Sequence, residues 1–137
     1  MYSNRVVVYT SGTFDMFHSN HLKMIEYAKG LGDTLIVGVS TDDLVASYKK
    51  PPIIPFEERI EIVKSIKYVD EVVPQIDKNK FAAWEKYRFN KMFVGSDWKG
   101  SKAWIHFEEQ LAPYGVQIVY LDHTDGISST ILREKLK

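Results

Sequence analysis

The sequence predicts an α/β protein: a Rossmann-like, doubly wound sheet of five parallel strands with helices on both faces. Short apolar runs alternate along the chain with segments whose apolar residues recur at helical spacing. The runs are continuously apolar, which is typical of parallel strands that are covered on both faces. Such a sheet has right-handed crossovers, and it binds ligands at the carboxyl ends of its strands, where the strand order reverses.

The first half of the chain is expected to alternate strands with helices as far as Pro74, which should end the third strand. Gly30 and Gly32 mark the first turn, and the Pro51-Pro52 pair excludes a regular helix around it. The predicted elements are a strand at 6–10, a helix that includes 22–28, a strand at 34–40, a short helix from 41 or 42 to 48, a loop at 49–52, a helix from 55 to 66 and a strand at 69–73.

The second half continues the same alternation and adds a tail helix with serine and threonine at its start. Residues of unusual chemistry fall in the loops that follow the first, second, fourth and fifth strands, which is the edge where such sheets bind ligands. The predicted elements are a helix at 79–88, a strand at 91–95, a loop at 96–100, a helix at 102–111, a strand at 116–121 and a helix at 128–136.

Length and composition narrow the class of protein. The 137 residues suit a single domain spanning 1–137, and 18 basic against 18 acidic residues give no net charge. This balance argues against a nucleic-acid-binding protein. The absence of cysteine excludes disulfides and cysteine zinc sites. With no long apolar run, we expect no membrane insertion and a cytoplasmic location.

The stretch from Gly12 to His21 organises the predicted site. It joins the first strand to the first helix, and a helix start offers unpaired N–H groups and a positive dipole end that suit phosphate. His18 and His21 would share one helical face, and an imidazole can donate a hydrogen bond to a phosphoryl oxygen. Taken alone, such a histidine pair also occurs by chance on protein surfaces or as part of a metal site.

Gly12-Thr13-Phe14-Asp15 followed by His18-x-x-His21 resembles the nucleotidyltransferase superfamily that carries a His-x-Gly-His signature. Asn20 stands at the glycine of that signature. Asparagine is the next most tolerant residue of unusual backbone angles, so the loop is expected to keep its shape.

Three later segments, in the same order and spacing, are similar to cytidylyltransferases, closest to those that act on glycerol 3-phosphate and also to the phosphoethanolamine enzymes. The resemblance runs from Tyr9 to Leu132. Ser96 replaces an aspartate of the family, and Lys67 and His123 replace two arginines. The three segments are 49–59 continued by 66–73, the loop 95–100 and the segment 123–130.

The resemblance implies transfer of CMP from CTP to a small phosphomonoester such as glycerol 3-phosphate, with release of pyrophosphate. The catalytic residues that it implies are His18, His21, Lys49 and Arg59. The nucleotide-binding residues that it implies are Gly12, Thr13, Phe14, Asp15, His18, His21, Lys49, Gly95, Asp97, Thr124, Gly126, Ile127, Ser128, Ser129 and Thr130. The acceptor-binding residues that it implies are Asp15, Arg59, Lys67, Trp98 and His123.

We expect no metal held by the protein alone. Mg²⁺ should arrive with the nucleotide, bound mostly by phosphates and water, with Asp15 as an outer-shell partner. The expected partners are CTP, a phosphorylated acceptor and a second copy of the chain in a homodimer.

Other interpretations stay open at this point. Arg59 could be a surface ion-pair residue beside Glu57 or Glu58, and Ser128 or Ser129 could simply cap a helix. The loop 95–100 could be a turn bounded by glycines. The alternative functions are an adenylyltransferase of the same fold that uses ATP, and a nucleotide-binding module without turnover.

Overall fold

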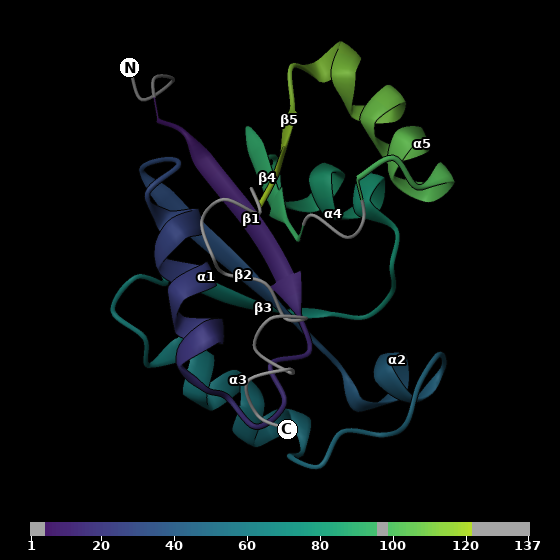
Figure 1. The fold of residues 1–137 in the computed structure, drawn as a ribbon. Coiled ribbons are helices and arrows are strands. Elements are labelled where there is room, and N and C mark those ends of the chain that lie inside the picture. Colours follow the sequence, from purple (N-terminus) through teal and green to yellow (C-terminus); the bar gives the residue numbers. More distant parts are fainter. Residues whose placement is uncertain (1–4, 96–98, 122–137) are drawn as a thin grey trace.

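A computed structural model describes residues 5–95 and 99–121 of the chain. Its centre is one sheet of parallel strands in the order β3-β2-β1-β4-β5 (Figure 1). The chain runs outward from β1 to β3 and then crosses back to place β4 beside β1. The strand order therefore reverses between β1 and β4. The strands are β1 (Val7–Gly12), β2 (Thr34–Ser40), β3 (Glu71–Gln75), β4 (Lys91–Val94) and β5 (Gln117–Tyr120).

The helices lie where the periodicity of the sequence predicts them. Side chains cap several of them: the Thr41, Asn79 and Ser101 oxygens each accept a backbone N–H at a helix start. Pro55 stands immediately before its helix, where its missing N–H costs nothing. The helices are α1 (Ser19–Lys29), α2 (Asp42–Ala46), α3 (Phe56–Lys64), α4 (Lys80–Tyr87), α5 (Lys102–Leu111) and the short 3₁₀ helix η3 (Ala112–Tyr114).

Two hydrophobic cores cover the two faces of the sheet. Val8 and Phe93 pack in a core with Ile25 of α1 and Val63 of α3. Their neighbours in the strands, Tyr9 and Met92, belong to the other core, as the two-residue period of a strand requires. That second core includes Trp84 of α4, and Trp104 and Leu111 of α5. The arrangement confirms the predicted doubly wound α/β fold (Figure 1).

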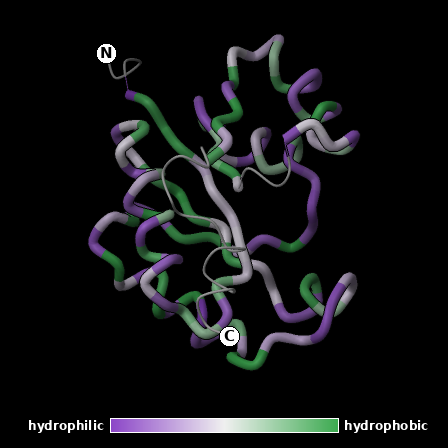
Figure 2. Tube along the Cα trace, viewed as in Figure 1, coloured by the Kyte–Doolittle hydropathy of each residue, from purple (hydrophilic) through white to green (hydrophobic). Residues whose placement is uncertain are grey.

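The hydropathy of the chain follows this layering. In Figure 2 the strands at the centre are mostly hydrophobic or neutral, whereas hydrophobic and hydrophilic residues alternate along the helices. Within the described ranges, no helix is both long enough and apolar enough to cross a membrane.

Pro74 does not end the third strand, as the sequence had suggested; it lies inside β3, opposite Val39 of β2. The physical reason is that β3 is an edge strand, where a residue without an N–H can be accommodated because one side of the strand has no partner in the sheet. β3 also begins at Glu71, later than predicted. The predicted tail helix at 128–136 lies outside the described residues.

Candidate active site

The loop between β1 and α1 bends sharply and contains two residues in the left-handed region. Phe14 has φ 55° and Met16 has φ 49°, an uncommon conformation for side chains of this size. Such strain persists only where the surroundings hold it, and it is concentrated at functional sites. The two strained residues therefore mark the loop between the carboxyl end of β1 and the first residue of α1 as a candidate functional segment.

Asp15 anchors this loop to the segment that precedes α3. Its two carboxylate oxygens accept the N–H groups of Ile53 (2.8 Å) and Ile54 (2.9 Å). Partial burial works to raise the pKa of Asp15, but these hydrogen bonds and nearby Arg59 outweigh it and lower the pKa. Asp15 is therefore an ionised loop anchor, with both oxygens already in use.

His18 and His21 cap the start of α1 reciprocally. The Nδ1 atom of His18 accepts the N–H of Asn20 (3.2 Å), and the Nδ1 atom of His21 accepts the N–H of His18 (3.2 Å). Their rings stack with centroids 4.0 Å apart. Because each Nδ1 is an acceptor, each neutral ring carries its proton on Nε2. The pair therefore keeps two Nε2–H donors for a ligand, on one face of the helix start.

His21 is held in its neutral form. The pKa of His21 is lowered to about 4, chiefly by burial and also by the neighbouring His18, while Asp15 works in the opposite direction. The rings of Phe14 and Phe17 pack against it, with centroids 5.6 Å and 5.2 Å away. At neutral pH His21 can thus donate a hydrogen bond but does not supply a positive charge.

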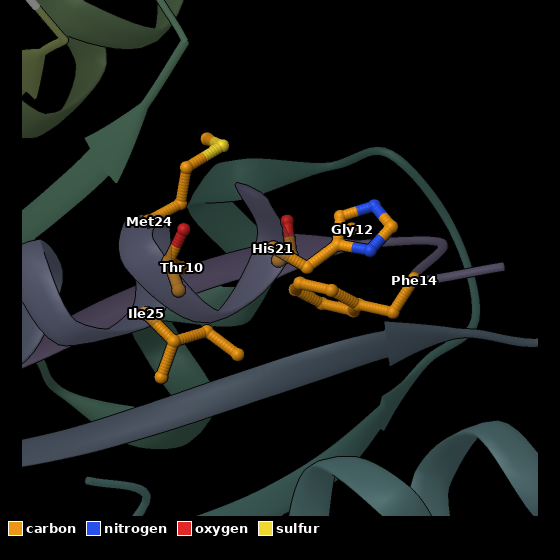
Figure 3. A pocket seen from close by; sticks show the side chains of 7 residues that line it. Thr10, Gly12, Phe14, His21, Met24 and Ile25 are labelled. Atoms are coloured by element: carbon orange, nitrogen blue, oxygen red, sulfur yellow. The ribbon is translucent and has the colours of Figure 1, made fainter. Parts of the chain in front are cut away.

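A cavity of about 130 Å³ opens beside His21 at the carboxyl end of β1. Figure 3 shows the His21 ring next to the ring of Phe14, with Met24 and Ile25 of α1 at the other end of the cavity. Its lining is mostly apolar, with the end of β1 as its polar side. The residues that line it are Thr10, Ser11, Gly12, Phe14, His21, Met24 and Ile25.

The sequence predicted that Arg59 contacts phosphate directly, but in the structure its guanidinium contacts the chain itself. Its side chain has no exposed surface. Nε donates to the carbonyl of Ile54 (2.7 Å), Nη1 to those of Thr13 (2.8 Å) and Ser40 (2.7 Å), and Nη2 to a carboxylate oxygen of Asp42 (2.6 Å). The guanidinium is thus engaged by the chain itself, and it is a positioning residue that joins the β1–α1 loop to the end of β2 and to the segment before α3. It is also no surface ion-pair residue.

Lys67 is another predicted site residue that the structure does not bring to the site. It follows the carboxyl end of α3, because that helix runs antiparallel to the strands and returns the chain to their amino ends. Asp70, just beyond it, accepts the N–H of Leu35 at the start of β2 (2.8 Å). Lys67 thus lies at the opposite edge of the sheet from the histidine pair, and its assignment to the acceptor site stays a prediction.

The structure keeps Lys49 and Gly95 at the predicted edge. Lys49 is exposed and follows α2, and its ammonium lies 5.5 Å from the centre of the Tyr48 ring. Gly95 follows β4, next to β1, and a Cβ atom added there would meet nothing within 4 Å. Asn20 lies in the first turn of α1 without a positive φ, so this position needs no glycine for its backbone. The predicted site residues outside the described ranges are Asp97, Trp98, His123, Thr124, Gly126, Ile127, Ser128, Ser129 and Thr130.

Sequence reasoning missed a polar network at the same edge of the sheet. Lys80, the first residue of α4, donates to Gln75 (2.8 Å) and to Ser11 (3.3 Å), and Gln75 donates to Ser40 (2.9 Å). Ser11, Ser40 and Gln75 lie at or near the ends of three neighbouring strands. In the sequence, this network could have been predicted only from the polar residues at the ends of neighbouring strands, and those residues match no known motif.

The family of the chain follows from comparison with known proteins. Residues 9–135 match the family described as Cytidylyltransferase-like. The chain belongs to the cytidylyltransferase-like family. It is 37% identical over 130 residues to a glycerol-3-phosphate cytidylyltransferase of Bacillus spizizenii, covering 94% of this chain and 95% of that protein. It is 34% identical over 134 residues to an ethanolamine-phosphate cytidylyltransferase of Arabidopsis thaliana, covering 91% of this chain and 31% of that protein.

A solved structure shares the fold of this cytidylyltransferase-like chain. The lipopolysaccharide core biosynthesis protein from Thermoplasma volcanium GSS1 matches with a TM-score of 0.76 and 24% identity, covering 87% of this chain and 98% of that one. Family membership confirms the resemblance read from the sequence motifs, and it makes the chain a nucleotidyltransferase.

Proposed function

We propose that the chain transfers CMP from CTP to glycerol 3-phosphate and releases pyrophosphate. The observation that carries this proposal is the reciprocally capped histidine pair, whose two Nε2–H donors lie at a helix start beside the point where strand order reverses. Relatives that are 32–37% identical over most of the chain are glycerol-3-phosphate cytidylyltransferases, which supports the choice of CTP and of this acceptor.

The reaction needs positioning and charge stabilisation more than proton transfer. A phosphate oxygen of the acceptor attacks the α-phosphorus of CTP, and the bond from that phosphorus to the oxygen bridging to the β-phosphate breaks. Because the attacking phosphate is already anionic, no strong general base is required. His18 and His21 donate hydrogen bonds to oxygens of the transferring phosphate, and Lys49 supplies an exposed positive charge at the same edge.

Mg²⁺ would arrive with the nucleotide and would neutralise charge on its phosphates. Both oxygens of Asp15 already accept backbone N–H groups, so this carboxylate fits an outer-shell position. We also propose that the protein acts as a homodimer in the cytoplasm. Sedimentation and cell fractionation would test these two assignments.

The test is pyrophosphate release by the purified protein, with CTP or ATP and with glycerol 3-phosphate or phosphoethanolamine. We expect the highest kcat/KM with CTP and glycerol 3-phosphate. Equal or better turnover with ATP would replace the proposal by an adenylyltransferase. Nucleotide binding without pyrophosphate release from any pair would leave only a binding module.

The histidine pair is tested in the same assay. His18→Ala and His21→Ala should each lower kcat by about 100-fold or more. His106→Ala is the matched control, because His106 is an exposed histidine of α5 with no place in the proposed site. Near-normal kcat in either site variant would remove that histidine from the mechanism.

A further inference from the structure

Lys49 supplies an exposed positive charge in the proposed reaction, but little of the fold supports its side chain. Residues 46–51 are all exposed, and α2 ends at Ala46. The backbone N–H of Lys49 donates to the carbonyl of Val45 (3.0 Å), which ties its backbone to the end of that helix. A free lysine side chain samples many rotamers, so holding its ammonium at one phosphate costs conformational entropy. The placement of this charge therefore depends on the neighbours of Lys49.

The preceding residue, Tyr48, contacts a lysine from a distant part of the chain. The ammonium of Lys78 lies 3.4 Å from the centre of the Tyr48 ring, well inside the range of about 6 Å for a cation–π interaction. The ammonium of Lys49 lies 5.5 Å from the centre of the same ring. The Tyr48 ring is thus held by Lys78, and it stands next to the Lys49 side chain.

The Tyr48–Lys78 contact joins the loops that follow two neighbouring strands. Tyr48 follows β2 by way of α2, and Lys78 lies between β3 and α4. In Figure 1, α2 lies beyond the carboxyl ends of the strands, on the side where β1 ends. The contact therefore lies at the edge of the sheet that carries the proposed site.

The Lys78 side of this contact is anchored by hydrogen bonds. Gln75, the last residue of β3, accepts the N–H of Thr41 at its carbonyl (3.1 Å). Asn79 caps the start of α4, and its own N–H donates to Asp77 (2.9 Å). Lys78 thus extends from an anchored segment, and its contact with Tyr48 gives the exposed segment a fixed support.

The other end of the exposed segment is anchored as well. The N–H groups of residues 53 and 54 donate to the carboxylate of Asp15 (2.8 and 2.9 Å). The Pro51-Pro52 pair between the two anchors restricts the backbone, because a proline ring fixes φ. Lys49 therefore lies between a cation–π contact on one side and a carboxylate anchor on the other.

We propose that Tyr48 and Lys78 are positioning residues whose contact holds Lys49 where its ammonium meets the transferring phosphate. The proposal rests on the proposed function, because it explains how the charge of Lys49 is placed for that reaction. Lys78 acts through Tyr48 and does not itself bind phosphate, since its ammonium is engaged with the ring. Part of the ordering of Lys49 then takes place on folding, and less of it opposes the reaction.

Kinetics of Tyr48→Leu, Lys78→Met and the double variant provide the first test. With CTP and glycerol 3-phosphate, each single change should lower kcat by about three- to fivefold, the factor that corresponds to a cation–π contact at an exposed site. The double variant should lose less than about twofold beyond either single variant, because both changes break the same contact. A smaller loss in either single variant would overturn the proposal.

Two further variants separate the contact from a general effect of substitution. Tyr48→Phe keeps the ring, so its kcat should stay within about twofold of the parent value. Lys86→Met is the matched control, because Lys86 is an exposed lysine whose ammonium lies 5.9 Å from the centre of the Tyr87 ring, in a helix outside the proposed site. It should leave kcat unchanged. A loss in Tyr48→Phe as large as that in Tyr48→Leu would show that the ring contact is not what matters.

A background without the Lys49 charge tests whether the contact acts through that residue. In Lys49→Met, we expect Tyr48→Leu and Lys78→Met to change kcat by less than about twofold, because the charge that they position is gone. An undiminished loss in this background would show that they act independently of Lys49. A larger loss in Lys78→Met than in Tyr48→Leu would show that Lys78 contacts phosphate directly. Either result would overturn the proposal.

Backbone hydrogen exchange provides a test that needs no turnover. The Lys49 N–H, which donates to Val45, should exchange about fivefold or more faster in Tyr48→Leu and Lys78→Met, and at the parent rate in Lys86→Met. Unchanged exchange in the first two variants would show that the contact does not hold the segment.

The outcomes separate this proposal from the proposed function. If the parent releases no pyrophosphate, the proposed function fails, while the exchange rates still decide whether the Tyr48–Lys78 contact orders Lys49. If the parent is active and Lys49→Met keeps its kcat, the transfer reaction stands, but Lys49 supplies no charge to it and the positioning role is refuted.

Discussion

Replacing Arg59 by methionine should destabilise the fold far more than replacing a surface cation. Methionine keeps most of the buried stem but removes every donor of the guanidinium. The carbonyls of Thr13, Ser40 and Ile54 then lose the partners that they have at 2.7–2.8 Å. The bond to Ser40 is fully buried, so water cannot replace the donor there without opening the structure.

The contacts of Arg59 set the size of this effect. A buried acceptor left without a donor costs about 1–3 kcal/mol, and loss of one partner of a buried ion pair costs about 3–5 kcal/mol. The Asp42 side chain is 46% exposed, so water can solvate its carboxylate and lessen the second cost. We therefore expect Arg59→Met to lower the free energy of unfolding by about 3–5 kcal/mol, a large part of the roughly 5–15 kcal/mol that is typical of a domain.

Urea unfolding followed by circular dichroism measures this loss. Lys64→Met is the matched control, because Lys64 is an exposed cation of the same helix, and it should change the unfolding free energy by less than about 0.5 kcal/mol. Arg59→Lys should lie between them, since an ammonium cannot reproduce the fork of donors. If Arg59→Met lost less than about 1 kcal/mol, the guanidinium would be free for a ligand and our reasoning would fail.

Three further predictions concern the β1–α1 loop and the start of α1. His21→Gln keeps an acceptor for the His18 N–H but removes the titrating imidazole. The pKa of His21 is lowered to about 4 in the folded protein, so protons bind preferentially to the unfolded chain below about pH 6.5. The parent should therefore lose unfolding free energy relative to this variant as the pH falls from about 6.5 toward 4. A parent–variant difference in unfolding free energy that is constant over this range would contradict it. Asp15→Ala should speed hydrogen exchange at the Ile53 and Ile54 amides about tenfold or more, and unchanged exchange would mean that other contacts hold that segment. Asn20→Gly should keep kcat within about tenfold and lower the unfolding free energy by about 0.5–1 kcal/mol, whereas collapse of activity would give the amide a role in binding.

The sequence predicted the fold because its signals are local and consistent. Continuous apolar runs, helical spacing and prolines at loop positions are all visible within short windows, and β2 has the predicted bounds. The error at Pro74 has a tertiary cause. Whether a proline can remain in a strand depends on whether that strand lies at the edge of the sheet, and strand order is set by the whole chain.

The site was harder to predict because residue type does not reveal whether a charge is free. Arg59 stands in a family motif, but in the folded chain its guanidinium donates to backbone carbonyls and to the Asp42 carboxylate. Lys67 is close to Arg59 in the sequence, but α3 carries it to the opposite edge of the sheet. Lys80 matches no motif, and only the assembled strand ends show where its ammonium lies. The histidine pair was predictable because its geometry is local to one helix start.

The basic side chains at the carboxyl edge have different uses, and this affects how a phosphate would be held. Arg59 is engaged by carbonyls and a carboxylate, and His21 is neutral near pH 7. Within the described ranges, Lys49 is an exposed cation at this edge, and the proposed function assigns it to phosphate. An ammonium is a point charge whose three donors rotate, whereas a guanidinium fork favours one fixed, bidentate geometry. Phosphoryl transfer changes the arrangement of oxygens around phosphorus, so in the proposed reaction we expect the rotating donors of Lys49 to follow the phosphate, while the Arg59 guanidinium holds the loops in place.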